Sequence, residues 1–323
     1  MASLLSVENL QVQFQTKKGI NTAVDGVSFS VEKGRILGIV GESGCGKSVT
    51  SMSILQLLGS NARISGGSIK LDGKELIGLP EKEMCRIRGN DIAMIFQDPM
   101  TALNPTLTIG TQLMEPIMLH QNCGKKEAWT RAVDVLKRVG IAAPEKRMKE
   151  YPHQLSGGMR QRVMIAMAVS CEPRLLIADE PTTALDVTIQ AQILELMCEL
   201  REKMGTAIML ITHDMGVVAE IADDVLVLYA GKAVEYGSIE DIFERPKHPY
   251  TQGLLNSIPR LDEDVELLNT IEGTVPAPDA MPAGCRFAPR CPYGKDRCMK
   301  EKPGVYHAGN SLVSCFRYEG EKE

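Results

Sequence analysis

The segment Gly41–Ser48, with the sequence GESGCGKS, constrains the fold of this chain more than any other segment. It matches the pattern G-x-x-x-x-G-K-[ST]; a short apolar run at 35–40 precedes it, and helical spacing follows at 48–58. Glycines let the backbone curl so that successive N–H groups point at one phosphate, and the following helix adds the positive end of its dipole. The sequence therefore predicts a buried strand, a phosphate-binding loop and a helix, in that order.

Two side chains of this loop have expected roles in nucleotide chemistry. Lys47 is expected to reach the β- and γ-phosphates of a nucleotide, and Ser48 to bind Mg²⁺. Cys45 stands at a variable position of the pattern and is interpreted as a packing residue. The residues predicted to bind nucleotide here are Gly41, Glu42, Ser43, Gly44, Cys45, Gly46, Lys47, Ser48 and Val49.

Apolar runs of strand length alternate with helical stretches along the following two hundred residues. Short apolar runs of this kind are typical of strands buried in a parallel sheet, and their alternation with helices predicts an α/β fold. Two earlier segments, at 7–14 and 23–31, alternate as strands do. The later predicted strands are 91–96, 175–178, 207–211 and 224–228, and the predicted helices are 128–139 and 188–203.

Composition limits where the protein acts. With 323 residues the chain is one large domain or two modest ones, and its formal net charge of −5 predicts no nucleic-acid-binding surface. No segment reaches the roughly 18 apolar residues that a membrane span needs, and the start lacks the pattern of a signal peptide. We therefore expect a cytosolic chain whose membrane role, if any, depends on a partner.

A pair of acidic residues follows one of the predicted strands. The run 175–178 delivers Asp179 and Glu180 to the carboxyl end of that strand, where parallel α/β sheets bind their ligands. Asp179 is assigned to Mg²⁺, and Glu180 is assigned as the general base that accepts a proton from the attacking water. A solvated pair of loop carboxylates is the alternative, which the intact phosphate loop argues against.

The segment Leu155–Arg162, LSGGMRQR, narrows the class of ATPase. It resembles L-S-G-G-x-x-Q-R, the signature sequence of the ABC ATPases. Ser156, Gly157 and Gly158 at a helix start offer backbone N–H groups to phosphate oxygens, and Gln161 is included among the expected contacts. The resemblance implies that these residues bind ATP held by the other subunit of a dimer.

Three further motifs follow in the order that this family has. Gln97 looks like the Q-loop glutamine, which contacts Mg²⁺ or the attacking water, and His213 looks like the switch histidine at the γ-phosphate. Asp186, in the segment 184–186, looks like part of the D-loop at the dimer interface, and Phe14 is the candidate for stacking on adenine. The catalytic residues that the resemblance implies are Lys47, Gln97, Glu180 and His213.

The ABC resemblance also implies a domain organisation. The fold class is α/β: a P-loop NTPase cassette with a RecA-like core, an antiparallel β subdomain and a helical subdomain, plus a small irregular Cys-rich C-terminal extension. The core is expected at 1–97 and 159–245, and the helical subdomain at 98–158 with the signature at its end. The extension covers 246–323, because repeated prolines from Pro259 onward interrupt regular structure.

The C-terminal extension points to one branch of the family. HPYTQGLL at 248–255 resembles the H-P-Y-T-x-x-L-L segment of dipeptide and oligopeptide importer ATPases, a family that also includes nickel importers, and GCRFAPRC at 284–291 fits the same family. The resemblance implies an ATPase subunit at the cytoplasmic face of the membrane that powers peptide import. Its implied partners are a second, distinct ABC ATPase, two permease subunits and an extracytoplasmic binding protein. The alternatives are nickel import, a soluble ABC ATPase acting on nucleic acid or ribosomes, an exporter, or a redox sensor.

Four of the nine cysteines, Cys285, Cys291, Cys298 and Cys315, lie in the extension. Disulfides are unexpected in a cytosolic protein, so metal binding or burial is the preferred interpretation. The spacing C-x5-C-x6-C-x16-C lacks the paired C-x2-C that is typical of zinc, whereas four cysteines can hold a 4Fe–4S cluster across varied loops. The sequence, together with the family resemblance, therefore favours an iron–sulfur cluster, with zinc and four free thiols as alternatives.

Overall fold

A mixed eight-stranded sheet forms the centre of the computed structural model, which describes residues 3–17, 19–98, 102–183, 186–258, 270–277 and 280–320. The strand order is β11-β12-β10-β9-β3-β8-β7-β6. The bounds are β3 Ile36–Val40, β6 Ile92–Ile95, β7 Leu175–Asp179, β8 Ala207–Thr212, β9 Asp224–Tyr229, β10 Lys232–Ser238, β11 Tyr306–Ala308 and β12 Ser311–Val313.

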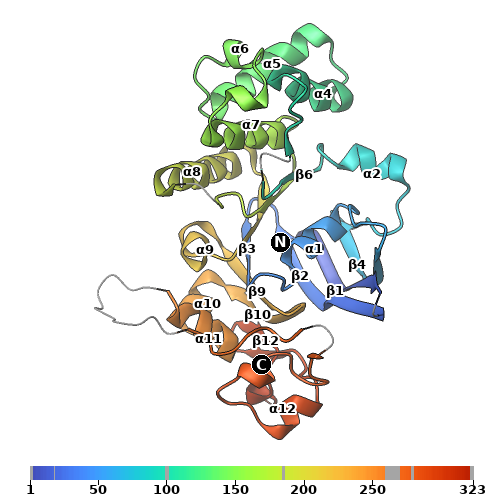
Figure 1. Ribbon diagram of the computed structural model, residues 1–323, viewed down its shortest axis with the longest axis vertical. Coiled ribbons are helices and arrows are strands. Elements are labelled where there is room, and N and C mark those ends of the chain that lie inside the picture. Colours follow the sequence, from blue (N-terminus) through green and yellow to red (C-terminus); the bar gives the residue numbers. More distant parts are fainter. Residues whose placement is uncertain are drawn as a thin grey trace.

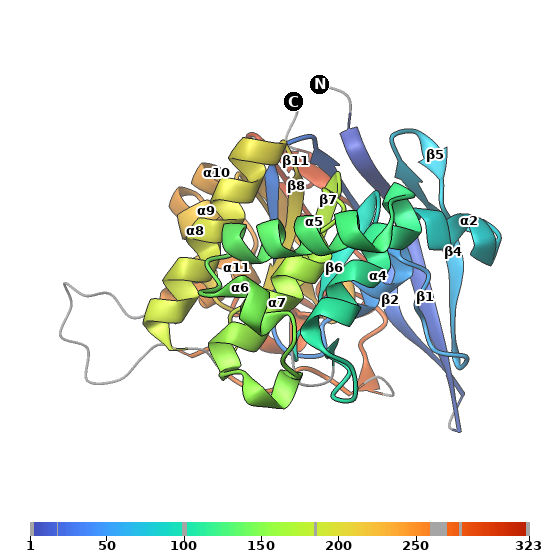
Figure 2. The ribbon, with the colours of Figure 1, turned by 90° about the horizontal axis from the view of Figure 1, so that it is seen from above.

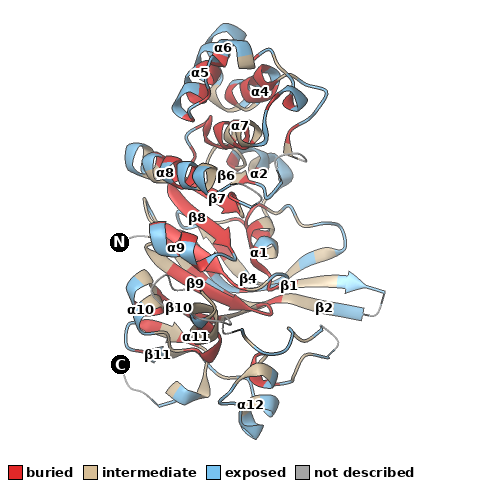
Figure 3. Cartoon of the chain, turned by 60° about the vertical axis from the view of Figure 1, so that its left-hand side comes forward, coloured by how far each residue is buried: buried red, intermediate tan, exposed pale blue. Residues whose placement is uncertain are grey.

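The inner strands of this sheet are parallel and almost fully buried. Neighbouring pairs among β9, β3, β8, β7 and β6 all run parallel, and every residue of β3, β7 and β8 is buried (Figure 3). Burial on both faces explains why these strands are continuous apolar runs in the sequence. Because the strands are parallel, their carboxyl ends, and the loops that follow them, meet at one edge of the sheet.

A separate four-stranded antiparallel sheet lies beside the main sheet (Figure 1). Its order is β2-β1-β4-β5, and its apolar side chains share one buried cluster with Leu37 and Ile39 of β3. The strand bounds are β1 Ser3–Thr16, β2 Gly19–Glu32, β4 Ala62–Leu71 and β5 Lys74–Glu75.

Helices α4 to α7 gather at the end of the molecule opposite the C-terminal extension (Figure 1), and Figure 2, seen from above, shows them in front. Side-chain acceptors cap several helix starts, including Thr108 for α4 and Ser156 for α7. No described helix combines the length and the apolar character that crossing a membrane requires. The helix bounds are α1 Lys47–Ile54, α2 Glu81–Ile87, α4 Ile109–Gln121, α5 Lys125–Arg138, α6 Pro144–Arg147, α7 Gly157–Val169, α8 Val187–Met204, α9 Met215–Ile221, α10 Ile239–Glu244, α11 Pro249–Asn256 and α12 Asp296–Lys300.

The predicted α/β architecture, with an antiparallel β subdomain and a group of helices, is confirmed. Helix α1 is shorter than predicted, because Leu55 is its C-cap and Gln56 adopts a left-handed backbone with φ of 50°. The irregular C-terminal extension is only partly as expected. The extension has short 3₁₀ turns at Ala288–Arg290 and Phe316–Tyr318, and its hairpin β11–β12 pairs with β10 and continues the main sheet. A third 3₁₀ turn, Pro152–Gln154, precedes α7.

Candidate nucleotide-binding and hydrolysis site

The phosphate loop leaves the carboxyl end of β3 in a conformation that requires glycine. Gly41 has φ of +152°, and a Cβ atom there would lie 2.1 Å from the carbonyl oxygen of Leu228 on the neighbouring strand. Gly44 and Gly46 have φ of 77° and 100°, in the left-handed region that side chains rarely adopt. The glycines of the motif are therefore needed for the shape of the loop.

Lys47 is held inside this loop. Its ammonium donates hydrogen bonds to the carbonyl oxygens of Gly41 at 2.6 Å and Glu42 at 3.2 Å, and the residue is buried. Cys45 is buried behind the loop, where burial raises the pKa of its thiol, consistent with the packing interpretation. Phe14 and Val49 are partly buried against the apolar cluster beside the antiparallel sheet.

Asp179, the last residue of β7, offers an unsatisfied oxygen to a cation. The side chain is buried, and burial is the main cause that raises the pKa of its carboxyl group, while a hydrogen bond from Ser48 lowers it. Its Oδ1 atom is buried without a hydrogen-bond partner. Since buried carboxylate oxygens are normally paired or bound to a metal, Asp179 and Ser48 fit a Mg²⁺ ion, which would neutralise phosphate charge at this position.

Two predicted catalytic side chains, Gln97 and His213, reach the carboxylate of a third, Glu180. Gln97, which follows β6, donates from Nε2 to Oε2 of Glu180 at 2.7 Å, and Nδ1 of His213, which follows β8, lies 3.3 Å from Oε1. The hydroxyl of Thr183 donates to Oε2 at 3.0 Å. The backbone of Glu180 is left-handed, with φ of 48°, and its N–H donates to Ile211 at 2.8 Å. The order of the parallel strands thus brings together side chains that the motifs singled out separately.

The signature segment is organised as a helix start. Ser156 caps α7 by accepting a hydrogen bond from the N–H of Met159 at 3.4 Å, and a Cβ added at Gly157 would meet nothing within 4 Å. Gln161 is buried and donates to the carbonyl oxygen of Pro181 at 2.6 Å, which ties the signature helix to the loop after Glu180.

The signature helix α7 lies with the helices at one end of the molecule, apart from α1 in its middle (Figure 1). The carboxylate of Asp186 caps α8 by accepting from Ile189 at 3.0 Å. Gly158 precedes the buried part of α7 and lies near the side chain of Ile189. Residues 184 and 185 of the predicted D-loop lie outside the described residues. The signature and D-loop contacts with nucleotide therefore stay predictions.

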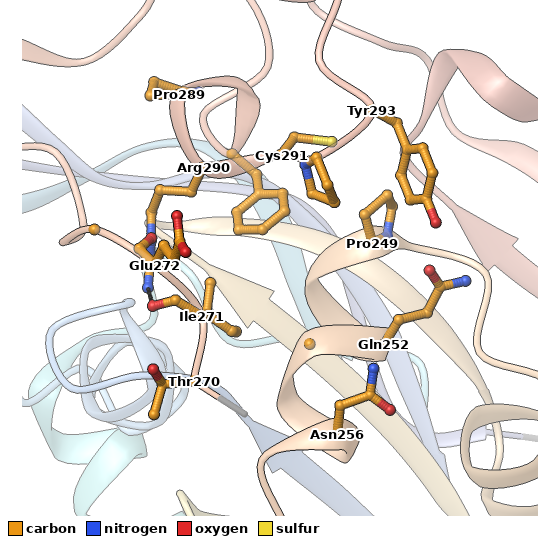
Figure 4. Close-up of a pocket in the computed structure, with 14 residues that line it drawn as sticks. Pro249, Gln252, Asn256, Thr270, Ile271, Glu272, Pro289, Arg290, Cys291 and Tyr293 are labelled. Atoms are coloured by element: carbon orange, nitrogen blue, oxygen red, sulfur yellow. Dashed lines mark hydrogen bonds between the residues drawn. The ribbon is translucent and has the colours of Figure 1, made fainter. Parts of the chain in front are cut away.

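Sequence reasoning missed the contacts that the C-terminal extension makes with the phosphate loop. The hydroxyl of Tyr250 accepts a hydrogen bond from the N–H of Glu42 at 2.9 Å, and Arg290 donates from Nη1 to both carboxylate oxygens of Glu42 at 3.0 Å. Arg290 also lines a pocket of about 620 Å³ between α11 and the segments 270–273 and 287–293 (Figure 4). No sequence signal connects these positions, because more than two hundred residues separate them from the loop.

The four cysteines of the extension line one small cavity of about 80 Å³. Burial is the main cause that raises the pKa of Cys285 to about 11, and it also raises the pKa of Cys291 and Cys315. Within the part of the chain that the structure describes, no three His, Cys, Asp or Glu side chains are arranged to hold one metal ion. The four thiols therefore lie around one cavity, but they do not point at a single common position.

Comparison with known proteins identifies the family. Residues 24–183 match the family described as ABC transporter, and residues 234–298 match the C-terminal region of oligopeptide/dipeptide transporters. The chain is similar to the oligopeptide transport ATP-binding protein AppD of Bacillus subtilis, with 56% identity covering 99% of this chain and 98% of that protein. It is also similar to the dipeptide transport ATP-binding protein DppD of Bacillus subtilis, with 54% identity (100% and 97%), and to OppD of Escherichia coli, with 52% identity (98% and 93%).

Solved structures agree with this assignment. The fold resembles the ATP-binding cassette MJ0796, described as a dimer in a post-hydrolysis state bound to ADP and Pi, with a TM-score of 0.66 and 27% identity over 73% of this chain and 98% of that one. The sequence identities extend through the C-terminal extension as well as the cassette. This chain belongs to the ABC transporter ATPases, in the family of oligopeptide/dipeptide transport ATP-binding proteins.

Proposed function

We propose that this chain hydrolyses ATP to power the import of short peptides through partner membrane subunits. The observation that carries the proposal is the convergence of Gln97 and His213 on Glu180, next to Asp179 and an intact phosphate loop. The similarity to peptide transport ATP-binding proteins along nearly the whole chain supports the substrate class. The relatives compared above are named for oligopeptides and dipeptides, and none of these names supports the nickel, nucleic-acid or ribosome alternatives.

The residues of the site divide the chemistry of hydrolysis among them. Lys47 exchanges its two carbonyl partners for the β- and γ-phosphate oxygens, and the loop N–H groups bind the remaining phosphate charge. Glu180 accepts a proton from the attacking water, and Gln97 orients that carboxylate and the water. His213 contacts the γ-phosphate as it separates. Mg²⁺, held by Ser48 and Asp179 with Gln97 as a further predicted ligand, would neutralise charge on the phosphates.

We propose that two cassettes complete each nucleotide site between them. Ser156, Gly157 and Gly158 present a helix start, and this start lies apart from the phosphate loop of the same chain (Figure 1). A second ABC ATPase subunit, a distinct homologue, would supply the signature in trans. Closure of the pair would act on two permease subunits through the helical subdomain at 98–158, at the cytoplasmic face of the membrane, with an extracytoplasmic binding protein delivering peptide.

Uptake by cells whose only peptide importer contains this chain tests the proposal. Uptake of a radiolabelled tripeptide should require ATP and should be lost with Lys47→Ala, because the phosphates lose their main cationic contact. A parallel assay with radioactive nickel should show no dependence on the chain. Equal tripeptide uptake by wild type and Lys47→Ala, at matched protein levels in the membrane fraction, would contradict the proposal. Nickel uptake that is present in wild type and lost in Lys47→Ala would instead identify nickel as the substrate.

We further propose that Cys285, Cys291, Cys298 and Cys315 hold an iron–sulfur cluster in the extension. In a 4Fe–4S cluster each thiolate binds a different iron, so the thiolates stand around a cavity, whereas a zinc site needs four ligands that converge on one ion. All four thiols line one small cavity, and this grouping is the observation that supports a shared cofactor. Such a cluster would cross-link a segment that has little apolar core of its own.

Metal analysis of anaerobically purified protein tests this cofactor. Iron and acid-labile sulfide near four atoms per chain, with broad absorbance near 400 nm, are expected if all four thiolates ligate a 4Fe–4S cluster. Cys298→Ser should lower both, whereas Cys85→Ser, at an exposed cysteine far along the chain from the cluster, should not. Protein that lacks iron but contains stoichiometric zinc, or that contains neither metal, would contradict the proposal.

A further inference from the structure

We propose that Arg290 of the C-terminal extension is a positioning residue for the phosphate loop, which it holds through Glu42. Its guanidinium donates to both carboxylate oxygens of Glu42 at 3.0 Å, with 6% of the Arg290 side chain and 29% of the Glu42 side chain exposed. Charge-assisted hydrogen bonds at such burial are strong and directional. The inference rests on the proposed nucleotide site and goes beyond it, because it assigns part of the loop's geometry to a segment outside the cassette.

The guanidinium of Arg290 is itself fixed on its other sides. Its Nε donates to the carbonyl oxygen of Glu272 at 3.0 Å, its Nη2 to that of Ile271 at 3.2 Å, and its Nη1 lies 3.4 Å from the hydroxyl of Tyr229 (Figure 4 shows Arg290 beside Ile271 and Glu272). A planar group with this many partners has one orientation available to it. Arg290 therefore presents a fixed point to Glu42 instead of a mobile surface charge.

A second residue from the C-terminal side holds the backbone at the same position. The hydroxyl of Tyr250 accepts from the N–H of Glu42 at 2.9 Å. The ring of Tyr250 is fully buried and packs on Tyr229 and Phe287, with centroid separations of 4.7 Å and 5.4 Å. Residue 42 is thus held at both its side chain and its N–H by residues that follow the cassette in the sequence.

The position of Glu42 affects the catalytic lysine directly. The carbonyl oxygen of Glu42 accepts from the ammonium of Lys47, so a shift of residue 42 moves one of the groups that hold this ammonium before nucleotide binds. Without Arg290 the carboxylate of Glu42 would also stand unpaired beside bound polyphosphate and would repel it. Loss of Arg290 should therefore weaken ATP binding while leaving Glu180, Gln97 and His213 in place for the chemical step.

The test measures ATP affinity of the purified full-length chain by displacement of the fluorescent analogue TNP-ATP. Arg290→Ala should raise the Kd for ATP about tenfold, which corresponds to about 1.4 kcal/mol of binding free energy. Arg297→Ala is the matched control, because Arg297 forms ion pairs only with Glu301 and Glu319 of the extension among the pairs described; it should leave Kd within about twofold. In the assembled transporter KM should rise with Kd, and kcat at saturating ATP should fall by less than about threefold.

A double-mutant cycle separates positioning from general destabilisation. In a Glu42→Gln background, Arg290→Ala should change Kd by less than about twofold, because the carboxylate that Arg290 holds is gone. Thermal unfolding without nucleotide reports whether each variant is folded. Arg290→Gln, which keeps donors for the carbonyl oxygens but loses the charge, replaces Arg290→Ala in the cycle if the alanine variant does not fold.

Two results would overturn the inference. One is a Kd for Arg290→Ala within twofold of wild type, and the other is an equal loss of affinity in the wild-type and Glu42→Gln backgrounds. The variant Lys47→Ala shows whether only the inference about Arg290 is wrong or the proposed nucleotide site itself is wrong. If Lys47→Ala weakens ATP binding and Arg290→Ala does not, only the inference fails, whereas unchanged affinity in Lys47→Ala means that the nucleotide site itself is misplaced.

Discussion

Glu180 occupies a backbone position that few residues tolerate, with φ of 48°, and three side chains reach its carboxylate there. Such strained positions are common at functional sites, where surrounding contacts hold them in place. In this protein the N–H of Glu180 donates to Ile211 of β8, so the strand that leads to His213 also fixes Glu180. The geometry of the hydrolytic cluster therefore depends on backbone pairing between neighbouring strands.

Glu180→Gln should abolish turnover with little effect on binding. An amide cannot accept the proton of the attacking water, and loss of general-base catalysis typically costs about 10²–10⁴-fold in rate. Phosphate release by the assembled transporter in a single turnover measures this loss, and TNP-ATP displacement measures binding, which should stay within about threefold. Glu195→Gln, at an exposed position of α8, serves as the control. If the Glu180→Gln variant hydrolyses ATP at a rate within tenfold of wild type, Glu180 is not the general base.

His248, the first residue of the HPYT segment, has a structural role in the fold. Its ring is buried and accepts a hydrogen bond at Nδ1 from the N–H of Tyr250 at 3.1 Å, which caps α11. Burial lowers the pKa of His248 to about 3, against 6.5 for the free side chain. The unfolded chain therefore binds one more proton than the folded chain between pH 3 and 6.5, and this residue makes stability fall as pH falls through that window.

The pH dependence of unfolding should change when His248 is replaced. Between pH 6.5 and pH 5 the histidine should cost about 2 kcal/mol of folding free energy, at about 1.4 kcal/mol per pH unit for one proton. His248→Asn keeps an N-cap acceptor but cannot titrate, so its loss of stability over the same pH range should be smaller by about that amount. Urea unfolding at pH 7.5 and pH 5 measures the difference, and equal pH dependence in the two proteins would contradict the assignment.

Strand β3 and helix α9 pack so closely that one glycine sets their spacing. A Cβ atom at Gly38 would lie 2.7 Å and 3.3 Å from the two methyl carbons of Val218, which is buried in α9. β3 pairs with both β8 and β9, so it cannot move aside without disturbing its neighbours. Because β3 leads into the phosphate loop, the packing of this strand also determines where that loop begins.

Gly38→Ala should destabilise the fold through this contact. The added methyl group overpacks the space between β3 and α9, and such overpacking typically costs about 1–3 kcal/mol. Gly124→Ala is the matched control, since Gly124 has φ of −76° and an added Cβ there would meet nothing within 4 Å. Chemical denaturation of the two variants should separate them by at least about 1 kcal/mol. A Gly38→Ala protein as stable as the Gly124→Ala protein would show that α9 can adjust freely.

The molecule as a whole is joined through its C-terminal extension. Hairpin β11–β12 continues the main sheet through β10, and Phe287 and Tyr250 belong to the same apolar cluster as Tyr229 of β9. Arg286 adds an ion pair to Asp25 of the antiparallel sheet at 3.0 Å. Because the extension shares a sheet, a core and ion pairs with the cassette, we expect the two to unfold together.

Val313→Asp tests this cooperativity. Val313 is fully buried in β12, and a carboxylate placed there loses its water without gaining a partner, which should cost about 3 kcal/mol or more. The unfolding midpoint should fall by the same amount whether it is followed by circular dichroism of the whole chain or by fluorescence of Trp129 in α5, at the far end of the molecule (Figure 1). Val305→Asp, at an exposed valine of the extension, should leave both unchanged. A fall seen only by one probe would mean that the extension unfolds separately.

Local motifs predicted the residues proposed for the nucleotide site and the type and approximate place of the core elements. The predicted strands at 91–96, 175–178, 207–211 and 224–228 correspond to β6, β7, β8 and β9 within two residues at each end. Two helices predicted from their spacing, at 128–139 and 188–203, correspond to α5 and α8. These predictions succeeded because a buried strand, a glycine-rich loop and an amphipathic helix each depend on residues that are close together in the sequence.

The sequence by itself determined the phosphate loop, the acidic pair and the signature, because each of these motifs consists of residues that are consecutive in the chain. Only the tertiary structure decided that Gln97 and His213 meet at Glu180, because this depends on the order of β6, β7 and β8 in the sheet. It also decided that Arg290 and Tyr250 reach Glu42, and that β12 completes the sheet beside β10. Such contacts join segments up to about 250 residues apart, and they form only after the core has brought the segments together.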